Sequence, residues 1–285
     1  TYILYRSEHQ KKRIKESPKV VPAEIQDKFA ESSKYFNSSY EEFIFYRTYS
    51  RWIPELNRRE TWEEAVKRTT NFMAGKLGKK LDAKDLKLVE KSILKHDVMP
   101  SMRHLWAAGP AADKTNVCIY NCAYIAPNTF KDFGEIMYVL MCGTGLGYSV
   151  ENKTAQQFPI IKKQEEGKKE IFVVEDEKEG WANAYVHALK TWFAGKDLDI
   201  DYSKIRPKGA RLKTMGGRAS GPDPLMDLMV FSKNLIFRKQ GKRLSNLDIH
   251  DIICKIGEIV VAGGVRRSAL ISLSDIDDAE LRKAK

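Results

Sequence analysis

The chain has 285 residues, of which 42% are hydrophobic and 31% charged, which is enough to bury a sizeable core in one or two domains. No apolar run approaches the roughly 20 residues that cross a bilayer, the start lacks the pattern of a secretory signal, and four cysteines are too few for a disulfide-stabilised secreted protein. These features exclude a membrane protein and favour a cytoplasmic location, while the formal net charge of +11 favours polyanionic partners.

The first 95 residues predict an N-terminal arm followed by a helical region. A short helix is expected over residues 24–34, within a polar and basic stretch. Thr61 and Glu64 have the spacing of a capping box, so a helix is predicted to begin there. Asp82 is expected to begin a further helix, because apolar residues recur after it at helical spacing.

Between residues 96 and 285 the pattern changes to alternating strands and helices. The segment Asn116–Ala126 has the apolar and β-branched residues of a strand, Phe130–Met141 has one apolar helical face, and Leu146–Val150 predicts a second strand. The order strand, helix, strand is typical of a parallel α/β unit, so the predicted fold class is α/β.

The remaining predicted elements alternate in the same way, after a charged and exposed connection over residues 151–170. Gly195 stands where a helix C-terminus needs a left-handed residue, and Gly263-Gly264 is expected to end a later helix. In chain order these elements are a strand at Ile171–Val174, a helix at Glu179–Ala194, a helix from Pro224 to about Lys239, a helix from Ser245, and a buried strand at Ser268–Leu273.

Glycine occupies every second position from Gly143 to Gly147, between a predicted helix and a predicted strand. A dinucleotide-binding loop runs in the opposite order, and a P-loop carries a lysine that this loop lacks, so both are disfavoured. Glycines still let a ligand or another backbone approach closely. The loop is therefore either a structural turn or a surface for a ligand.

Three of the four cysteines, Cys118, Cys122 and Cys142, lie around this loop. If residues 116–126 form one strand, Cys118 and Cys122 share a face at a separation of about 13 Å, which is too far for a disulfide. No Cys-X-X-Cys pair and no histidine at ligand spacing accompanies them, so no metal site is predicted. Each is either a small buried residue or a reactive thiol, and Cys254, on an apolar helix face, is expected in the core.

Positive charge is clustered in two runs. The first, from Lys204 to Arg218, contains no acidic residue and leads through glycines to Ser220 ahead of a helix, which suits an anion at a helix N-terminus. The alternative is that its arginines are surface ion-pair partners. The second run, residues 233–243, is either a solvated basic face or part of a polyanion site.

A series of longer motifs stands in order between Tyr46 and the end of the last predicted strand. They are Arg47–Trp52, Met99–Gly109, Tyr120–Tyr124, Gly143–Val150, Glu179–Trp181, Ile205–Ala210, Gly216–Pro222 and Val261–Ala269. Together these motifs resemble the class II, adenosylcobalamin-dependent ribonucleotide reductases, and among them most closely the monomeric ribonucleoside-triphosphate reductase type.

The resemblance implies a ten-stranded α/β barrel made of two five-stranded halves, preceded by helices. On this interpretation residues 1–95 are the N-terminal arm and helical region, and residues 96–285 are the first half of the barrel. The family's Asn-Pro-Cys-Gly-Glu motif, which carries the radical cysteine, does not occur here. The chain is therefore expected to be the N-terminal portion of a longer enzyme or one half of a split one.

The same resemblance implies radical-based reduction of ribonucleoside triphosphates, or diphosphates, to 2′-deoxyribonucleotides. Cys122 matches one member of the catalytic, redox-active cysteine pair, which a thioredoxin-like reductant regenerates. The matching substrate-binding positions are Val98, Met99, Ser101, Asn121 and Gly143. The loop that couples substrate choice to a nucleotide effector matches Lys213, Gly216, Gly217, Arg218 and Ser220.

The cofactor implied by the resemblance is adenosylcobalamin, whose binding residues are not identifiable in this sequence; a stable-radical partner subunit is the alternative radical source. The expected partners are the nucleotide substrate and effector, the reductant and the C-terminal half of the barrel, with no membrane and with nucleic acid disfavoured. Two other functions remain open. The charge of +11 also fits a basic nucleotide- or nucleic-acid-binding module, and the missing motifs fit a half-enzyme that is inactive without a separate C-terminal chain.

Overall fold

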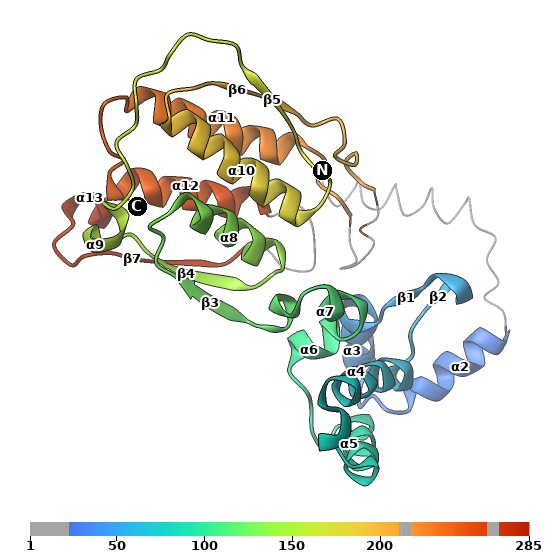
Figure 1. Cartoon of the computed structure of the whole chain (residues 1–285). Helices are drawn as coiled ribbons and strands as arrows, with labels where there is room; N and C mark the ends of the chain where they lie inside the picture. The colour runs from blue at the N-terminus through green and yellow to red at the C-terminus, as the bar shows by residue number, and fades with distance from the viewer. Residues whose placement is uncertain (1–22, 211, 213–217, 261–267, 285) are drawn as a thin grey trace, which may run out of the picture. The chain divides into compact units, whose positions relative to one another are not determined.

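The computed structural model describes residues 23–210, 212, 218–260 and 268–284. These residues belong to two compact units, one ending at Pro100 and one beginning at Ser101 (Figure 1). The domain boundary expected from the sequence lies between residues 95 and 96. The helix end expected at Gly263-Gly264 lies outside the described residues.

The first unit is helical, as expected. Its predicted helix starts are confirmed, because Thr61 and Glu64 close a capping box and the Asp82 side chain accepts from the Lys84 backbone N–H. The elements are α2 (Ala23–Ser33), α3 (Ser39–Ile44), a π-helical turn (Phe45–Tyr49), the antiparallel pair β1 (Trp52–Ile53) and β2 (Arg58–Arg59), α4 (Trp62–Leu77) and α5 (Ala83–Leu94).

Trp62 is the central side chain of this first unit. Its buried ring meets Phe45 edge-on with 5.3 Å between the ring centroids, and its indole Nε1 donates to the Leu94 carbonyl at 3.1 Å. Beside it Arg58 donates twice to Glu64, at 2.7 and 2.8 Å. This guanidinium favours the ionised carboxylate and lowers the pKa of Glu64 to about 2. The first unit is thus held by an aromatic cluster and a bidentate ion pair.

The second unit combines a three-stranded parallel sheet, a separate pair of parallel strands and a layer of helices (Figure 1). Its elements are α6 (Met102–Ala107), α7 (Pro110–Lys114), a 3₁₀ turn (Asn116–Ile119), β3 (Cys122–Ile125), α8 (Phe130–Met141), β4 (Gly145–Ser149), α9 (Asn152–Ala155), β5 (Glu170–Val173), α10 (Lys178–Phe193), β6 (Leu198–Asp201), α11 (Asp223–Arg238), α12 (Asn246–Ile259), β7 (Leu270–Leu273) and α13 (Ala279–Arg282).

The predicted strand–helix–strand unit is confirmed as β3, α8 and β4. The two strands are parallel, with Cys122 opposite Gly145 and Tyr124 opposite Gly147, and β7 pairs with the other edge of β4, placing Gly147 opposite Ile271. Parallel neighbours require a crossover connection, which α8 provides between β3 and β4 and α10 provides between β5 and β6. The mixed α/β class is confirmed, and the ten-stranded barrel stays a prediction.

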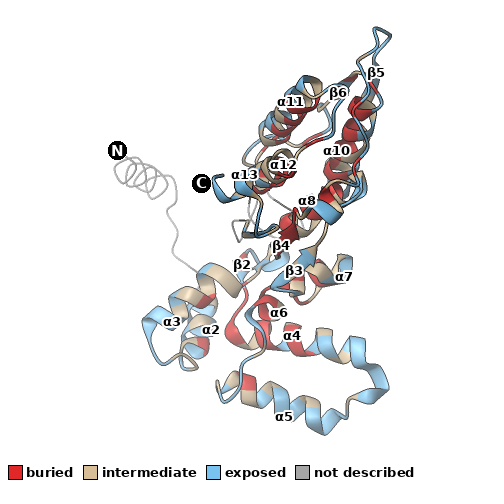
Figure 2. Ribbon diagram, turned by 90° about the vertical axis from the view of Figure 1, so that its left-hand side faces the viewer, coloured by how far each residue is buried: buried red, intermediate tan, exposed pale blue. Residues whose placement is uncertain are grey.

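Helices cover one face of the three-stranded sheet. α8 and α12 contact the strands, while α10 and α11 pack on their far side (Figure 1). Figure 2 shows buried positions where these helices face one another. The apolar face of α8 is buried as its spacing predicts, through Phe133, Ile136, Met137 and Leu140. None of the described helices has the length and apolar content needed to span a membrane.

The strand predicted over residues 116–126 is wrong in its first half, which forms a 3₁₀ turn. Thr144 Oγ1 donates to the Tyr120 carbonyl at 3.0 Å and to a second carbonyl of the turn at 2.9 Å. These bonds satisfy backbone groups that would otherwise need a neighbouring strand. The extended segment begins only at Cys122, so Cys118 does not share a strand face with it.

Two further predictions fail because they depend on distant parts of the chain. The connection over residues 151–170 is not uniformly exposed, since Phe158 and Ile161 are buried in the core of the second unit. The strand predicted as buried, β7, is an edge of the described sheet, and its Ile271 and Leu273 are 67% and 47% exposed. An apolar run predicts a strand but does not reveal how many layers cover it.

Candidate functional site

One face of the three-stranded sheet is open, and the predicted catalytic cysteine lies on it. Side chains alternate along a strand, and the register places on this face Cys122, Tyr124, Gly145, Gly147, Ile271 and Leu273, together with Ser149, which is buried at the end of β4. Cys122 is exposed at the start of β3. The opposite face carries Leu146 and Tyr148, which are buried. The open face is therefore a surface available to a ligand or to a further layer of protein.

Gly145 and Gly147 form a strip of bare backbone along the middle of the open face. A methyl group added at Gly145 would lie 3.5 Å from the Asn121 carbonyl oxygen, and one added at Gly147 would lie 3.4 Å from the Tyr124 ring. Both are ordinary van der Waals contacts, and neither residue has a positive φ. The fold thus accommodates a methyl group at both positions, and the glycines leave that space open.

Gly143 is a glycine for a different reason. It follows Cys142, the C-cap of α8, and has φ +78°. Its N–H donates to the Leu140 carbonyl at 2.8 Å, and the Thr144 N–H donates to the Val139 carbonyl at 3.3 Å. This is a Schellman motif, whose left-handed residue is usually glycine. A methyl group there would also lie 3.0 Å from the Arg103 guanidinium. The helix end alone accounts for Gly143, and its predicted substrate contact stays a prediction.

Asn121 lies directly beside this strip, because its carbonyl oxygen accepts from the Gly145 N–H at 2.9 Å. Cys122, the next residue, is the register partner of Gly145. Ser101 belongs to the same unit and caps α6, accepting from the His104 N–H at 3.5 Å. The structure thus brings together Asn121, Cys122 and the glycine strip.

The other two predicted substrate residues, Val98 and Met99, belong to the first unit, where both are exposed. Their predicted contact with the substrate stays a prediction.

The other two cysteines near the sheet are buried. The Cys118 thiol donates to the Thr115 carbonyl at 3.0 Å. The Cys142 sulfur accepts a hydrogen bond from the Lys178 ammonium at 3.5 Å. Burial raises the pKa of the Cys142 thiol despite that lysine. Cys122 therefore differs from Cys118 and Cys142 in being exposed.

The predicted effector-coupling loop is described only in part, since Lys213, Gly216 and Gly217 lie outside the described residues. Arg218 Nη1 donates to the Gly209 carbonyl at 2.9 Å, and Ser220 Oγ donates to the carbonyl of the following residue, Gly221, at 3.1 Å. The Arg218 bond connects the two ends of the loop, whereas the Ser220 bond is only to the adjacent residue. Its coupling to an effector stays a prediction.

Acidic neighbours neutralise part of both basic runs. Arg206 Nε lies 2.6 Å from an Asp176 carboxylate oxygen, and Lys233 Nζ lies 2.6 Å from an oxygen of Asp197. Such pairs favour the ion-pair alternative over an anion site at these positions. They also leave less free positive charge for a nucleic acid than the sequence alone indicates.

Cys254 is exposed, which corrects the prediction that it lies in the core. Its thiol lies 3.4 Å from His250 Nε2 on the same helix. The spacing His250 to Cys254 is one helical turn, so it was visible in the sequence as a possible side-chain pair.

Two family models match the chain. The model of the ribonucleotide reductase alpha domain matches residues 23–110, and that of the B12-dependent ribonucleotide reductase insertion domain matches residues 149–236. The second match runs from the end of β4 into α11. The two matches thus lie on both sides of the open, cysteine-bearing strand β3.

Curated relatives and a solved structure agree with these models. The adenosylcobalamin-dependent ribonucleoside-triphosphate reductase of Lactobacillus acidophilus is 30% identical over 84% of this chain and 42% of its own length. The enzyme of the same name from Euglena gracilis is 32% identical over 86% of this chain and 36% of its own. A crystal structure of a B12-dependent (class II) ribonucleotide reductase matches with a TM-score of 0.72 and 26% identity, covering 84% of this chain and 42% of the other.

By fold, by both family models and by these relatives, the chain belongs to the ribonucleotide reductase family. The relatives are named adenosylcobalamin-dependent and the solved structure B12-dependent (class II), which confirms the class II branch that the sequence motifs indicate. The chain spans about two fifths of the length of these relatives.

Proposed function

We propose that this chain forms a substrate-facing wall of a ribonucleotide reductase catalytic subunit, which reduces ribonucleoside triphosphates, or diphosphates, to 2′-deoxyribonucleotides. The observation that carries the proposal is the exposed thiol of Cys122 beside the bare backbone of Gly145 and Gly147. Bare backbone lets a flat nucleotide approach the sheet closely. The triphosphate is favoured because the curated relatives are named ribonucleoside-triphosphate reductases.

In this proposal Cys122 is one of two thiols that reduce the 2′ carbon of the ribose. The two thiols give up two hydrogen atoms and become a disulfide, while the 2′ hydroxyl leaves as water. A thioredoxin-like dithiol then restores both thiols by exchange. Cys118 does not suit the second role, because its sulfur is buried against the Thr115 carbonyl while Cys122 is exposed. The second thiol and the radical cysteine are expected from the other half of a ten-stranded barrel.

The proposed cofactor is adenosylcobalamin, after the names of the relatives and of the insertion-domain model. When bound, it supplies the radical that begins the reaction. The exposed side chains of the open face, Tyr124, Ile271 and Leu273, do not distinguish a macrocycle from a further layer of protein. We therefore assign no residue to the cofactor and derive no step through it.

Replacing the proposed redox thiol tests this function. In the complete enzyme, Cys122→Ser should lower thioredoxin-dependent turnover by at least about 10³-fold, because a hydroxyl cannot form the disulfide that ends the reaction. Cys118→Ser is the matched control, since serine keeps the hydrogen bond to Thr115 and should retain turnover. The measurement is deoxynucleotide formation per enzyme per minute. Undiminished turnover in Cys122→Ser would refute the assignment.

A further inference from the structure

A second group of reactive side chains lies where α12 meets β4 and β7. His250 and Cys254 are one turn apart on α12, Tyr148 comes from β4, and Ser272 comes from β7. The Tyr148 hydroxyl lies 2.9 Å from His250 Nδ1, and Ser272 Oγ lies 3.1 Å from the same nitrogen. Cys254 Sγ lies 3.4 Å from His250 Nε2 and 3.5 Å from the Tyr148 hydroxyl. Three elements thus converge on one thiol and one imidazole.

The two hydroxyl groups orient the imidazole toward the thiol. When the His250 ring is protonated both of its nitrogens donate, Nε2 to the sulfur and Nδ1 to a hydroxyl oxygen. The Tyr148 side chain is buried as a whole, which fixes the position of its hydroxyl oxygen. A nucleophile next to a base that a third group orients is the arrangement found in thiol enzymes.

The electrostatics of the group favour the thiolate form. The hydrogen bond from His250 lowers the pKa of the Cys254 thiol, and the bond from Tyr148 acts in the same direction. Partial burial and the nearby Asp251 carboxylate oppose this effect without reversing it. The thiolate in turn raises the pKa of His250, while burial raises the pKa of Tyr148 and keeps its hydroxyl a donor.

Cys254 is also accessible, which the other hydrogen-bonded thiols are not. Cys118 and Cys142 are buried, and burial raises the pKa of Cys142. Cys122 is exposed, but its thiol makes no hydrogen bond to any residue that the structure describes. Cys254 therefore combines exposure with a neighbouring imidazole.

The cluster is separate from the proposed nucleotide surface. Tyr148 and Ser272 alternate with Gly147 and Ile271 along their strands, so their side chains leave the opposite face of the sheet. No group of three or more possible metal ligands occurs within the described ranges, and this cluster has only the two donors of His250 and Cys254. Its chemistry is that of a thiol rather than of a metal site.

We propose that Cys254, held against His250, is a modification site at which small disulfides form a mixed disulfide with the chain. The Cys254 thiolate attacks one sulfur of R–S–S–R, so a bond forms from Sγ to that sulfur and the original S–S bond breaks. The departing R–S⁻ takes a proton from water or from protonated His250. The reagent is reduced to one free thiol, Cys254 is oxidised, and a second thiol reverses the step.

Alkylation and exchange rates of the individual cysteines test this proposal. The probes are iodoacetamide and cystamine, and peptide mass spectrometry measures the modified fraction of each cysteine over time. At pH 7 Cys254 should react first of the four, and at least about fivefold faster than the same cysteine in the urea-unfolded chain. Its pH–rate midpoint should lie below that of the unfolded chain.

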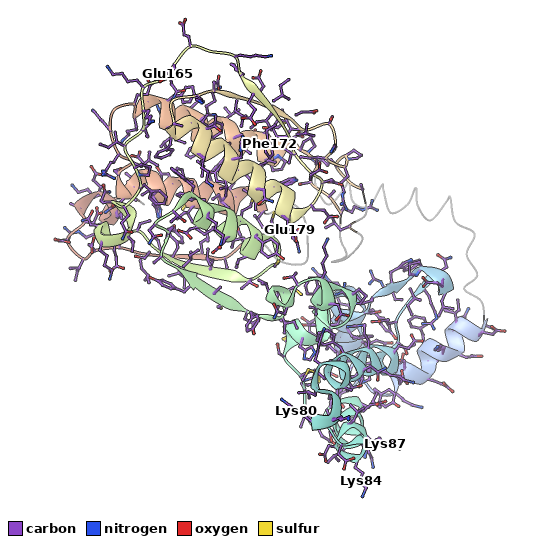
Figure 3. The ribbon with its side chains drawn as sticks, viewed as in Figure 1. Lys80, Lys84, Lys87, Glu165, Phe172 and Glu179 are labelled. Carbon is purple, nitrogen blue, oxygen red and sulfur yellow. The ribbon has the colours of Figure 1, made fainter. Side chains whose placement is uncertain are left out.

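The variant His250→Gln removes the charge while keeping a hydrogen-bonding side chain. It should slow the reaction of Cys254 at pH 7 by at least about fivefold and move the pH–rate midpoint upward. The matched control is His187→Gln on α10, whose ring stacks on Phe172 (labelled in Figure 3) with 4.6 Å between the ring centroids. That variant should leave the Cys254 rate unchanged.

Two results would overturn the proposal. One is a Cys254 rate no greater in the folded chain than in urea, and the other is a folded His250→Gln variant with an unchanged rate and midpoint. If His250→Gln does not fold, the pH–rate midpoint of Cys254 in the unmodified folded chain is compared with that in the urea-unfolded chain. A midpoint that is not lower in the folded chain then overturns the proposal. Cystamine adds a second criterion, since a mixed disulfide at Cys254 must form and must be removed by added thiol.

Discussion

The three glycines after α8 differ in why they are glycine. Gly143 is required by a left-handed helix end, and a methyl group there would also lie 3.0 Å from the Arg103 guanidinium. Gly145 and Gly147 lie in a regular strand with room for a methyl group. The sequence pattern left a structural turn and a ligand surface as alternatives. The structure assigns the turn to Gly143 and leaves the open surface to the other two.

Filling the open surface tests that distinction. Gly147→Val should weaken binding of a ribonucleoside triphosphate to the complete enzyme by at least about tenfold, or about 1.4 kcal/mol, because the side chain occupies the space over the strand. The melting temperature should not fall, since valine suits a strand and its Cβ meets only ordinary contacts. Isothermal titration calorimetry and thermal denaturation measure the two quantities.

The control is Gly167→Val, at an exposed glycine with no atom within 4 Å of an added methyl group. It should change neither affinity nor melting temperature. Equal nucleotide affinity in Gly147→Val and the unmodified enzyme would show that the glycine strip does not face the substrate.

At the scale of elements, helix ends were predicted accurately because their signals are local. The start of α12 at Ser245 is a capping box in which Ser245 and Asp248 bond each other's backbone N–H groups. Gly195 follows α10 with φ +80°, and the N–H groups of Gly195 and Lys196 donate to the Trp192 and Thr191 carbonyls. These signals need only residues within one helical turn.

Two glycine-to-alanine variants separate backbone conformation from crowding at such ends. Gly195→Ala should lower the free energy of unfolding by more than about 2 kcal/mol, because φ is positive and the new methyl group would overlap the Lys163 carbonyl oxygen. Gly241→Ala has nearly the same φ, +77°, but nothing within 4 Å, so it should cost only about 1 kcal/mol. Urea denaturation gives both values. Similar losses in the two variants would mean that the contact with Lys163 is relaxed without cost.

Elements whose form depends on distant partners were predicted less well. The turn over Asn116–Ile119 has strand-like residues, but Thr144, far along the chain, bonds its carbonyl groups. β7 has the composition of a buried strand, yet one of its faces is open in the described structure. Local composition cannot report either circumstance.

At the scale of the whole chain, the charge of +11 is unevenly available. The basic runs of the second unit contain internal ion pairs such as Arg206 with Asp176. Lys80, Lys84 and Lys87 of the first unit are exposed near the start of α5 (Figure 3). Net charge alone therefore overstates the case for a nucleic-acid partner.

Ligand protection distinguishes a reductase chain from a nucleic-acid-binding module. A ribonucleoside triphosphate should raise the melting temperature of the complete enzyme at 0.15 M salt, because a ligand bound to the folded state stabilises it. Duplex DNA at the same phosphate concentration should have no comparable effect, since attraction to exposed lysines is weakened by salt. Differential scanning fluorimetry measures both shifts. A larger shift with DNA, falling steeply with salt, would favour the nucleic-acid module.

The sequence by itself determined the helix boundaries, the parallel strand–helix–strand unit and the family, because caps, periodicity and contiguous motifs are properties of neighbouring residues. Only the tertiary structure decided which cysteine is exposed, which glycines leave open space and which cations are paired. It also brought Tyr148, Ser272 and His250 to Cys254 from three elements. Burial, strand register and pairing arise from contacts between residues far apart in the chain, which a linear pattern does not contain.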